Sequence, residues 1–243
     1  MLGTVKELIR PFFIFRLKIK ASAAMPMQLN GNALILAPHP DDEIFGCGGL
    51  IARLTSQGKP PHVAILTGGG RSHHGCCATS EETIVTQRRT LTIKSLTALG
   101  IPACNIHFLN FQDGNIGDKP GSEMNRLKNL LSDLQPDTIL VPHHGEGWPD
   151  HLATRQIGID LAPKGAQVWE YCVWMWYYSQ HGLDWKNART LNMSATEHAS
   201  KLNAIATYSN SCAPCGKPWI GVLPKLFIRA NSKKHELFFR ITK

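Results

Sequence analysis

Residues 32–50 read NALILAPHPDDEIFGCGGL, and this segment is the clearest indication of the fold class. Its first part, Asn32–Ala37, is a short apolar run of the kind that forms a buried strand. The polar segment Pro38–Glu43 follows, and the next apolar run, Ile44–Ser56, predicts a helix that ends before Gly58. A strand, a polar turn and a helix in this order form the opening unit of an α/β domain.

The same alternation continues along the chain. Further strands are predicted at 62–66, 105–109 and 138–141, and further helices at 80–99 and 122–134. After residue 167 the pattern is less regular and predicts an aromatic strand-like stretch to Tyr178, a helix at 196–205 and a basic C-terminal strand or tail. Strands that alternate with helices at this spacing predict one α/β domain, with a mostly parallel sheet flanked by helices.

The first 30 residues form a basic and aromatic N-terminal arm, which we separate from a domain at 31–243. Residues 9–20 read IRPFFIFRLKIK, and their longest apolar run, Pro11–Phe15, is too short for a transmembrane helix or a signal-peptide core. Such an arm can pack on the domain, which is the interpretation we prefer, or lie on an anionic membrane surface. The second interpretation predicts a peripheral association with the inner face of a membrane.

The composition is that of a globular protein, with 43% hydrophobic and 18% charged residues. A formal net charge of +8 favours an anionic partner. The basic residues are scattered and no base-stacking aromatic motif accompanies them, so we expect no nucleic-acid binding. An anionic membrane surface and a phosphorylated substrate are the partners that the charge then favours.

Seven cysteines lie at positions 47, 76, 77, 104, 172, 212 and 215. Their number is odd and their spacing follows no disulfide framework, so we expect mostly free thiols in a reducing compartment, and hence a cytoplasmic protein. Cys212 and Cys215 form a C-x-x-C pair that follows no βαβ start. We interpret this pair as structural or incidental, because a redox site of this type is expected near such a start.

Two polar loops follow the first and the fourth predicted strands. The first loop holds His39, Asp41, Asp42 and Glu43, and the second holds His143, His144, Glu146, Asp150 and His151. Ligands of parallel sheets bind beyond the carboxyl ends of the strands, so we expect these loops to form one site. Crowded carboxylates repel one another unless a cation or a proton intervenes, and a His/Asp/His set suits zinc with a fourth position left to water. Capping of the following helix is the alternative role for the aspartates, but it leaves the second loop unexplained.

Two motifs carry a resemblance to a known family. Pro38–Glu43 followed by Gly46–Gly49 resembles the signature of the LmbE-like (PIG-L) family of zinc-dependent N-acetyl deacetylases, and Pro149–His151 resembles the later motif of that family. The resemblance runs from about Ala33 to Arg155. It implies a Rossmann-like fold and the hydrolysis of an N-acetyl group from an amino sugar of the N-acetylglucosamine type, which gives acetate and a free amine. The implied substrate is a small-molecule, lipid-linked or nucleotide-linked amino sugar.

The resemblance also implies roles for the loop residues. Its metal ligands would be His39, Asp42 and His151, which would hold Zn²⁺ or another divalent transition metal such as Fe²⁺. Asp41 would be the general base that takes a proton from metal-activated water. Glu43 and Asp150 would not bind the metal themselves, but would orient the metal-binding residues or support their loop.

Substrate contacts are predicted for three further residues. Asp113 would hydrogen-bond sugar hydroxyls according to the resemblance. Arg71 in the loop after the second strand can reach a phosphate or a sugar, or can lie in a solvated loop. Trp148 departs from the family pattern, which usually has a histidine here, and tryptophan offers only a donor N–H. A neighbour such as His144 or His143 then substitutes, or protonation runs through Asp41 alone. A third alternative is a catalytically impaired protein that binds metal or sugar without turnover.

A nucleotide-binding Rossmann module without a metal is a rival class. Gly46, Gly48 and Gly49 do not have the G-x-G-x-x-G spacing of a dinucleotide site, and the carboxylates just before them would repel a pyrophosphate. We therefore assign these glycines to close helix packing.

Overall fold

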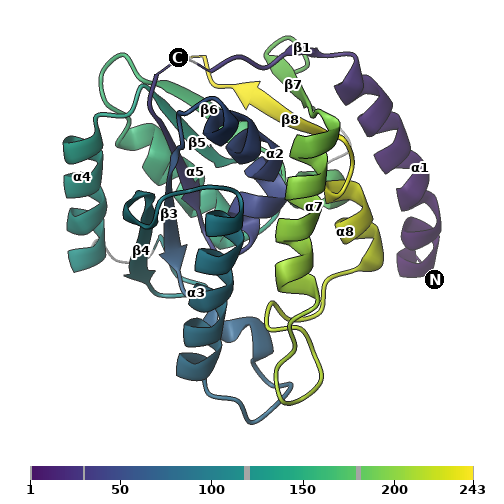
Figure 1. The fold of residues 1–243 in the computed structure, drawn as a ribbon. Coiled ribbons are helices and arrows are strands. Elements are labelled where there is room, and N and C mark those ends of the chain that lie inside the picture. The colour runs from purple at the N-terminus through teal and green to yellow at the C-terminus, as the bar shows by residue number, and fades with distance from the viewer. Residues whose placement is uncertain (1, 30, 118–120, 179–181, 243) are drawn as a thin grey trace.

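A twisted sheet forms the centre of the computed structural model, which describes residues 2–29, 31–117, 121–178 and 182–242 (Figure 1). Within these residues the sheet has eight strands in the order β1-β7-β8-β6-β5-β2-β3-β4. In that order the strands are β1 (Met25–Pro26), β7 (Ala188–Asn192), β8 (His235–Arg240), β6 (Gln167–Tyr171), β5 (Thr138–Pro142), β2 (Ala33–Ala37), β3 (His62–Thr67) and β4 (Ile106–Phe111). Only β8 runs antiparallel to its neighbours, so the prediction of a single α/β domain with a mostly parallel sheet is confirmed.

Helices cover both faces of the sheet. They are α1 (Leu2–Ser22), α2 (Asp42–Ser56), α3 (Glu81–Ala98), α4 (Ser122–Leu134), α5 (Pro149–Asp160), α6 (Met175–Tyr178), α7 (Ala195–Ser209) and α8 (Lys225–Asn231), with short 3₁₀ turns η1 (Gly70–His73) and η2 (Ala103–Asn105). Figure 1 shows α7 beside α2 and α3, and α4 at the β4 side of the molecule. The helices predicted from the sequence are present, whereas α5 begins inside the stretch that we predicted as a polar loop.

Alternation along β2 assigns its side chains to two cores. Ile35 and Ala37 belong to the core under α2, α3 and α7, while Leu34 and Leu36 belong to the core under α4 and α5. This is the two-residue period of a strand that is covered on both faces. β2 lies between β3 and β5, where the strand order reverses, so the polar segments after β2 and β5 meet at the topological switch point.

Glycines let α2 pack closely on the rest of the fold. A Cβ added at Gly46 would lie 2.3 Å from Cδ2 of Tyr171, and one added at Gly49 would lie 2.3 Å from Sδ of Met193. The Tyr171 hydroxyl, from β6, donates to the carbonyl of Leu36 at 2.8 Å. These contacts agree with the packing role that we assigned to the glycines.

A buried ion pair also joins α2 to α7 and β8. Lys201 donates to Glu236 at 2.6 Å and to the carbonyl of Phe45 at 2.8 Å. Glu236 in turn accepts from the backbone amides of Gly49 at 2.7 Å and Leu50 at 2.9 Å. The pair therefore satisfies backbone groups in the middle of α2 as well as its own charges.

The N-terminal segment is a helix that packs on the domain. Ile14, Leu17 and Ala21 of α1 are buried in a third apolar cluster with residues of β7 and β8. The opposite side of α1 leaves Phe12 and Phe15 largely exposed. The predicted boundary at residue 30 lies outside the described residues. No helix in the described part of the chain combines the length and the hydropathy needed to cross a bilayer.

Candidate metal centre

The three predicted metal ligands come from the two segments that meet at the switch point. His39 follows β2, Asp42 opens α2, and His151 lies in the first turn of α5. Oδ2 of Asp42 lies 3.2 Å from Nδ1 of His39 and 3.3 Å from Nε2 of His151. The structure thus brings two imidazole nitrogens and one carboxylate oxygen together around a single point.

A further carboxylate lies close to the second ring nitrogen of each imidazole in this group. Nε2 of His39 lies 3.2 Å from Oδ2 of Asp150, and Nδ1 of His151 lies 3.3 Å from Oε2 of Glu146. Metal-binding histidines typically have such a carboxylate on the second nitrogen, which orients the ring and fixes its tautomer. The donor set fits a divalent transition metal such as Zn²⁺, because His/Asp/His offers three ligands and leaves further positions free.

Backbone amides hold both supporting carboxylates in place. Asp150 accepts from Gly114 at 2.7 Å and from Ile116 at 3.2 Å. Glu146 accepts from the amide of Trp174 at 2.6 Å and from two neighbouring amides. His39 also lies close to Asp113 and Asp150, and these three residues are an alternative set of metal ligands. We favour the set of His39, Asp42 and His151, because both oxygens of Asp150 already accept backbone hydrogen bonds.

Asp41 lies beside this group in an unusual backbone conformation. Its φ is 105°, and its amide donates to the Glu43 carboxylate at 2.9 Å. Left-handed conformations of this kind cost about 1–3 kcal/mol and persist where the surroundings impose them. Burial raises the pKa of Asp41 to about 7, against the opposing effect of the Arg88 guanidinium 3.3 Å away. A carboxyl group with a pKa near neutrality can both accept and release a proton.

Glu43 supports Asp41 from the protein interior. It is fully buried, accepts from the Tyr208 hydroxyl at 2.7 Å, and has its pKa raised to about 8 by burial. The Tyr208 hydroxyl oxygen also lies 3.1 Å from the Thr92 hydroxyl. Glu43 thus accepts a hydrogen bond from the backbone of Asp41, as expected of a group that positions its neighbour.

A cavity of about 490 Å³ opens onto the metal centre. Beyond the metal centre its walls include Arg71, Ser72, Trp148, Trp174, Ile220 and Leu223. Trp148 is 43% exposed and packs edge-on against Trp174, with ring centroids 5.6 Å apart. This volume fits a sugar-sized ligand, and the walls combine apolar and charged groups.

Of the three residues predicted to bind substrate, two line the cavity and one does not. Asp113 and Arg71 both line the cavity, and the amide of Arg71 donates to the Asp113 carboxylate at 2.8 Å. His144 is absent from the cavity wall: its Nδ1 faces Glu170 of β6 at 3.2 Å. The substrate contact that we predicted for His144 is therefore not carried into the site, because Glu170 holds the imidazole away from it.

Several residues of the site had no role in the predictions made from the sequence. Arg88 fell within the resemblance but without a function, and Glu146 was only one polar residue among several in its loop. Tyr208 carried no signal, because its contact with Glu43 depends on how α7 packs, whereas Trp174 belongs to the aromatic stretch predicted after residue 167.

Fold and site together define the class of the protein: a Rossmann-like α/β protein with a His/Asp/His centre at the switch point of its sheet. Residues 34–162, more than half of the chain, match the sequence profile of PIG-L, GlcNAc-PI de-N-acetylase. The chain belongs to the PIG-L family.

Similar proteins include a probable N-acetyl-α-D-glucosaminyl L-malate deacetylase 2 of Bacillus cereus, 31% identical over 50% of this chain and 56% of that protein. The chain spans about half the length, or less, of several curated relatives that it matches. The N,N'-diacetylchitobiose deacetylase of Pyrococcus horikoshii aligns with a TM-score of 0.60 at 20% identity, over 88% of this chain and 80% of the other.

The fold itself is not confined to deacetylases. A 4-carboxy-2-hydroxymuconate hydratase from Pseudomonas putida aligns with a TM-score of 0.66 at 16% identity, over 88% of this chain and 97% of the other. At these identities the structural likeness establishes the fold alone, so the reaction has to be argued from the site.

Proposed function

We propose that the chain is a metal-dependent hydrolase that removes the acetyl group from an amino sugar of the N-acetylglucosamine type. The observation that carries the proposal is the convergence of His39, Asp42 and His151 at the mouth of a sugar-sized cavity, with the Asp41 carboxylate beside them. Family membership and the deacetylase activity of relatives support the same reaction.

The metal site would be formed by His39, Asp42 and His151. When bound there, Zn²⁺ would polarise an acyl oxygen and lower the pKa of a water molecule to about 7. Fe²⁺ is an alternative, since imidazole and carboxylate ligands suit both ions.

The proton is handled by Asp41. Its carboxylate lines the cavity and takes a proton from the attacking water, and the same carboxyl group then returns the proton to the leaving amine. Arg88 holds this carboxylate through its guanidinium. Because Trp148 departs from the pattern that the resemblance implies and offers only a donor N–H, one group, Asp41, serves as base and acid in turn.

Binding of the sugar falls to the cavity walls. Asp113 accepts hydrogen bonds from sugar hydroxyls, and the Arg71 side chain binds an anionic or hydroxyl-rich part of the substrate. Trp148 and Trp174 offer apolar ring faces and edges against which a pyranose ring can pack. The anionic part can belong to a nucleotide-linked or lipid-linked sugar.

Acetate release from a panel of substrates tests the proposed function. The panel contains N-acetylglucosamine glycosides, nucleotide-linked N-acetylglucosamine and lipid-linked N-acetylglucosamine, each with metal-loaded and chelated protein. The proposal predicts acetate from at least one member, lost on chelation and in Asp42→Ala. A metal-loaded, folded protein that releases acetate from none of them would support the non-catalytic alternative.

We also propose that the protein is cytoplasmic and that α1 lies on an anionic membrane surface. All seven cysteines are free thiols, as a reducing compartment favours. On α1, the exposed side chains Phe12, Phe15 and Ile19 form an apolar stripe beside the exposed cations Arg16 and Lys20. A helix with this pattern binds anionic lipid through both its apolar and its basic side chains.

Vesicle flotation tests the membrane contact. Wild-type protein is expected to float with phosphatidylserine vesicles more than with phosphatidylcholine vesicles, and Phe12→Ser/Phe15→Ser to lose most of this binding. The matched control is Val222→Ser, which changes an exposed apolar residue away from α1. Equal flotation of the wild type with both lipids, or none with either, would contradict the contact.

A further inference from the structure

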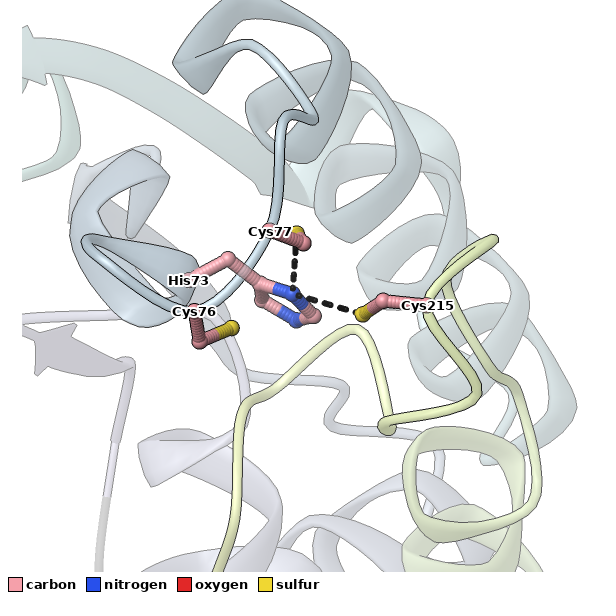
Figure 2. Close-up of side chains that lie close together, drawn as sticks. All are labelled: His73, Cys76, Cys77 and Cys215. Atoms are coloured by element: carbon pink, nitrogen blue, oxygen red, sulfur yellow. Dashed lines mark hydrogen bonds between the residues drawn. The ribbon is translucent and has the colours of Figure 1, made fainter.

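A second cluster of metal-binding side chains lies away from the metal centre. Figure 2 shows His73, Cys76 and Cys77 from the segment after β3, together with Cys215 from the loop after α7. One ligand atom from each of the four residues lies within 4.8 Å of the other three. Nδ1 of His73 lies 3.4 Å from the sulfur of Cys77 and 3.6 Å from that of Cys215.

These separations match the edges of a zinc tetrahedron. With Zn–S bonds of about 2.3 Å and Zn–N bonds of about 2.0–2.1 Å, tetrahedral geometry places nitrogen and sulfur about 3.6 Å apart. Hydrogen bonds alone account for the cluster poorly, because two thiols face the same ring nitrogen, which has one lone pair. A single cation bound by all four side chains would explain why they lie so close together.

The histidine is held in the tautomer that a metal requires. Nε2 of His73 contacts the carbonyl of Pro218 at 2.8 Å, where it can only donate, so the lone pair of the neutral ring is on Nδ1. The side chain is 2% exposed, and this nitrogen faces the sulfur atoms. A backbone carbonyl on the second ring nitrogen is a usual feature of zinc-binding histidines.

Metal ligation requires the deprotonated form of cysteine, and a bound cation would itself deprotonate the three thiols of the cluster.

We propose that His73, Cys76, Cys77 and Cys215 form a structural zinc site that joins the segment after β3 to the loop after α7. Four protein ligands fill the tetrahedron, as is typical of structural sites, in contrast to the three ligands of the metal centre. Of the C-x-x-C pair only Cys215 takes part. Cys212 lies outside the cluster, and its backbone pairs with Pro218 instead.

The site would fix one wall of the cavity. Arg71 and Ser72 precede His73 directly, while Ile220 and Leu223 follow Cys215 in the second loop, and all four line the cavity. The two segments are also tied by the Ser72 hydroxyl, which donates to the carbonyl of Trp219 at 3.2 Å. Zinc at this position would hold the two parts of the wall at a constant separation.

Cobalt substitution tests this site independently of any enzymatic activity. Reduced, metal-free full-length protein is titrated with Co²⁺, and thiolate-to-cobalt charge-transfer absorption is recorded in the near ultraviolet. We expect a thiolate band for the wild type, and its loss or strong reduction in Cys77→Ser and Cys215→Ser. The metal centre contains no cysteine, so His151→Ala should keep the band even if the proposed hydrolysis is wrong.

Matched controls and metal content complete the test. Cys212→Ser and Cys104→Ser change exposed cysteines outside the cluster and should leave the band unchanged. Wild-type protein is expected to hold about two zinc ions per chain, and Cys215→Ser and His151→Ala about one each. Chelation should lower the Tm of His151→Ala but not that of Cys215→Ser/His151→Ala. A reduced wild type without the band, or a band that depends on Cys212 and not on Cys215, would overturn the proposal.

Discussion

The guanidinium of Arg88 lies 3.3 Å from the carboxylate of Asp41, although the two residues belong to different segments of the fold. Arg88 comes from α3, donates to the carbonyl of Gly69 at 2.9 Å, and also donates to the carbonyl of Pro40. It is 4% exposed. The arginine therefore ties the turn before α2 to the segment after β3 and fixes the position of the proposed base.

Replacing Arg88 should impair turnover more than binding. Arg88→Met removes the charge and the hydrogen bonds that hold Asp41, so we expect kcat to fall by about 10²-fold with little change in KM. Steady-state kinetics on an acetylated amino sugar would measure the effect. The neighbouring Arg89 is exposed on α3 and serves as the control, since Arg89→Met should stay close to wild type. Equal kcat values for the two variants would refute the positioning role.

The buried pair Lys201–Glu236 should be important for stability. Lys201→Met leaves Glu236 buried without its counter-charge, and we expect the free energy of unfolding to fall by about 3–5 kcal/mol. Urea denaturation at neutral pH measures this change. The double variant Lys201→Met/Glu236→Gln removes the unpaired charge and should recover part of the loss, whereas Lys225→Met on the surface should change little. A single variant as stable as wild type would show that Glu236 does not need this partner.

Stability should decrease in acid because of His143. This side chain is fully buried, and burial together with His144 and Arg155 lowers its pKa to about 2. Glu170 lies 3.7 Å from Nε2, but Arg155 and His144 already engage that carboxylate, so burial dominates the pKa of His143.

The sign of the effect follows from the protons bound by each state. Between pH 6.5 and 2 the unfolded chain protonates His143 while the folded chain does not, so acid favours unfolding. This group contributes at most about 1.4 kcal/mol per pH unit. His143→Gln should show a correspondingly smaller loss of stability between pH 7 and pH 5 by urea denaturation. An identical pH dependence in the variant and the wild type would argue against this role.

Trp148 should affect substrate binding. Trp148→Ala removes an exposed aromatic edge from the cavity wall, and a lost contact of about 0.5–1.5 kcal/mol corresponds to a rise in KM of about 2–10-fold. Tyr178→Ala is the control, because Tyr178 contacts Trp148 from outside the cavity lining. An unchanged KM in Trp148→Ala would separate this residue from sugar binding.

Local patterns in the sequence were sufficient to predict most of the fold. The apolar run of β2, the helical period of α2 and the order of the following elements depend on neighbours in sequence, and these were predicted near their observed positions. The insertion of β8 between β6 and β7 was not predicted, because antiparallel pairing across the chain leaves no local signal.

The candidate site likewise combines residues that local motifs predicted and residues that only the folded chain brings together. His39, Asp42 and His151 were recognisable because two short motifs carry them at strand ends. The contact of Tyr208 with Glu43 spans 165 residues, and the contact of Cys215 with His73 spans 142. The C-x-x-C spacing of Cys212 and Cys215 was interpreted as structural or incidental, and only Cys215 of the two belongs to the cluster with His73. His144 was predicted to contact substrate, but Glu170 of the adjacent strand engages it instead.

The most direct test of the central claim compares acetate release by the wild type and Asp41→Asn at equal metal content. The substrate is the best member of the N-acetylglucosamine panel, and metal is measured in the same samples. Asn keeps the shape of the side chain but cannot take a proton, so we predict metal retention with at least about a 10²-fold loss of kcat. Unchanged acetate release by metal-loaded Asp41→Asn would contradict the assignment of Asp41 as the base of this hydrolase.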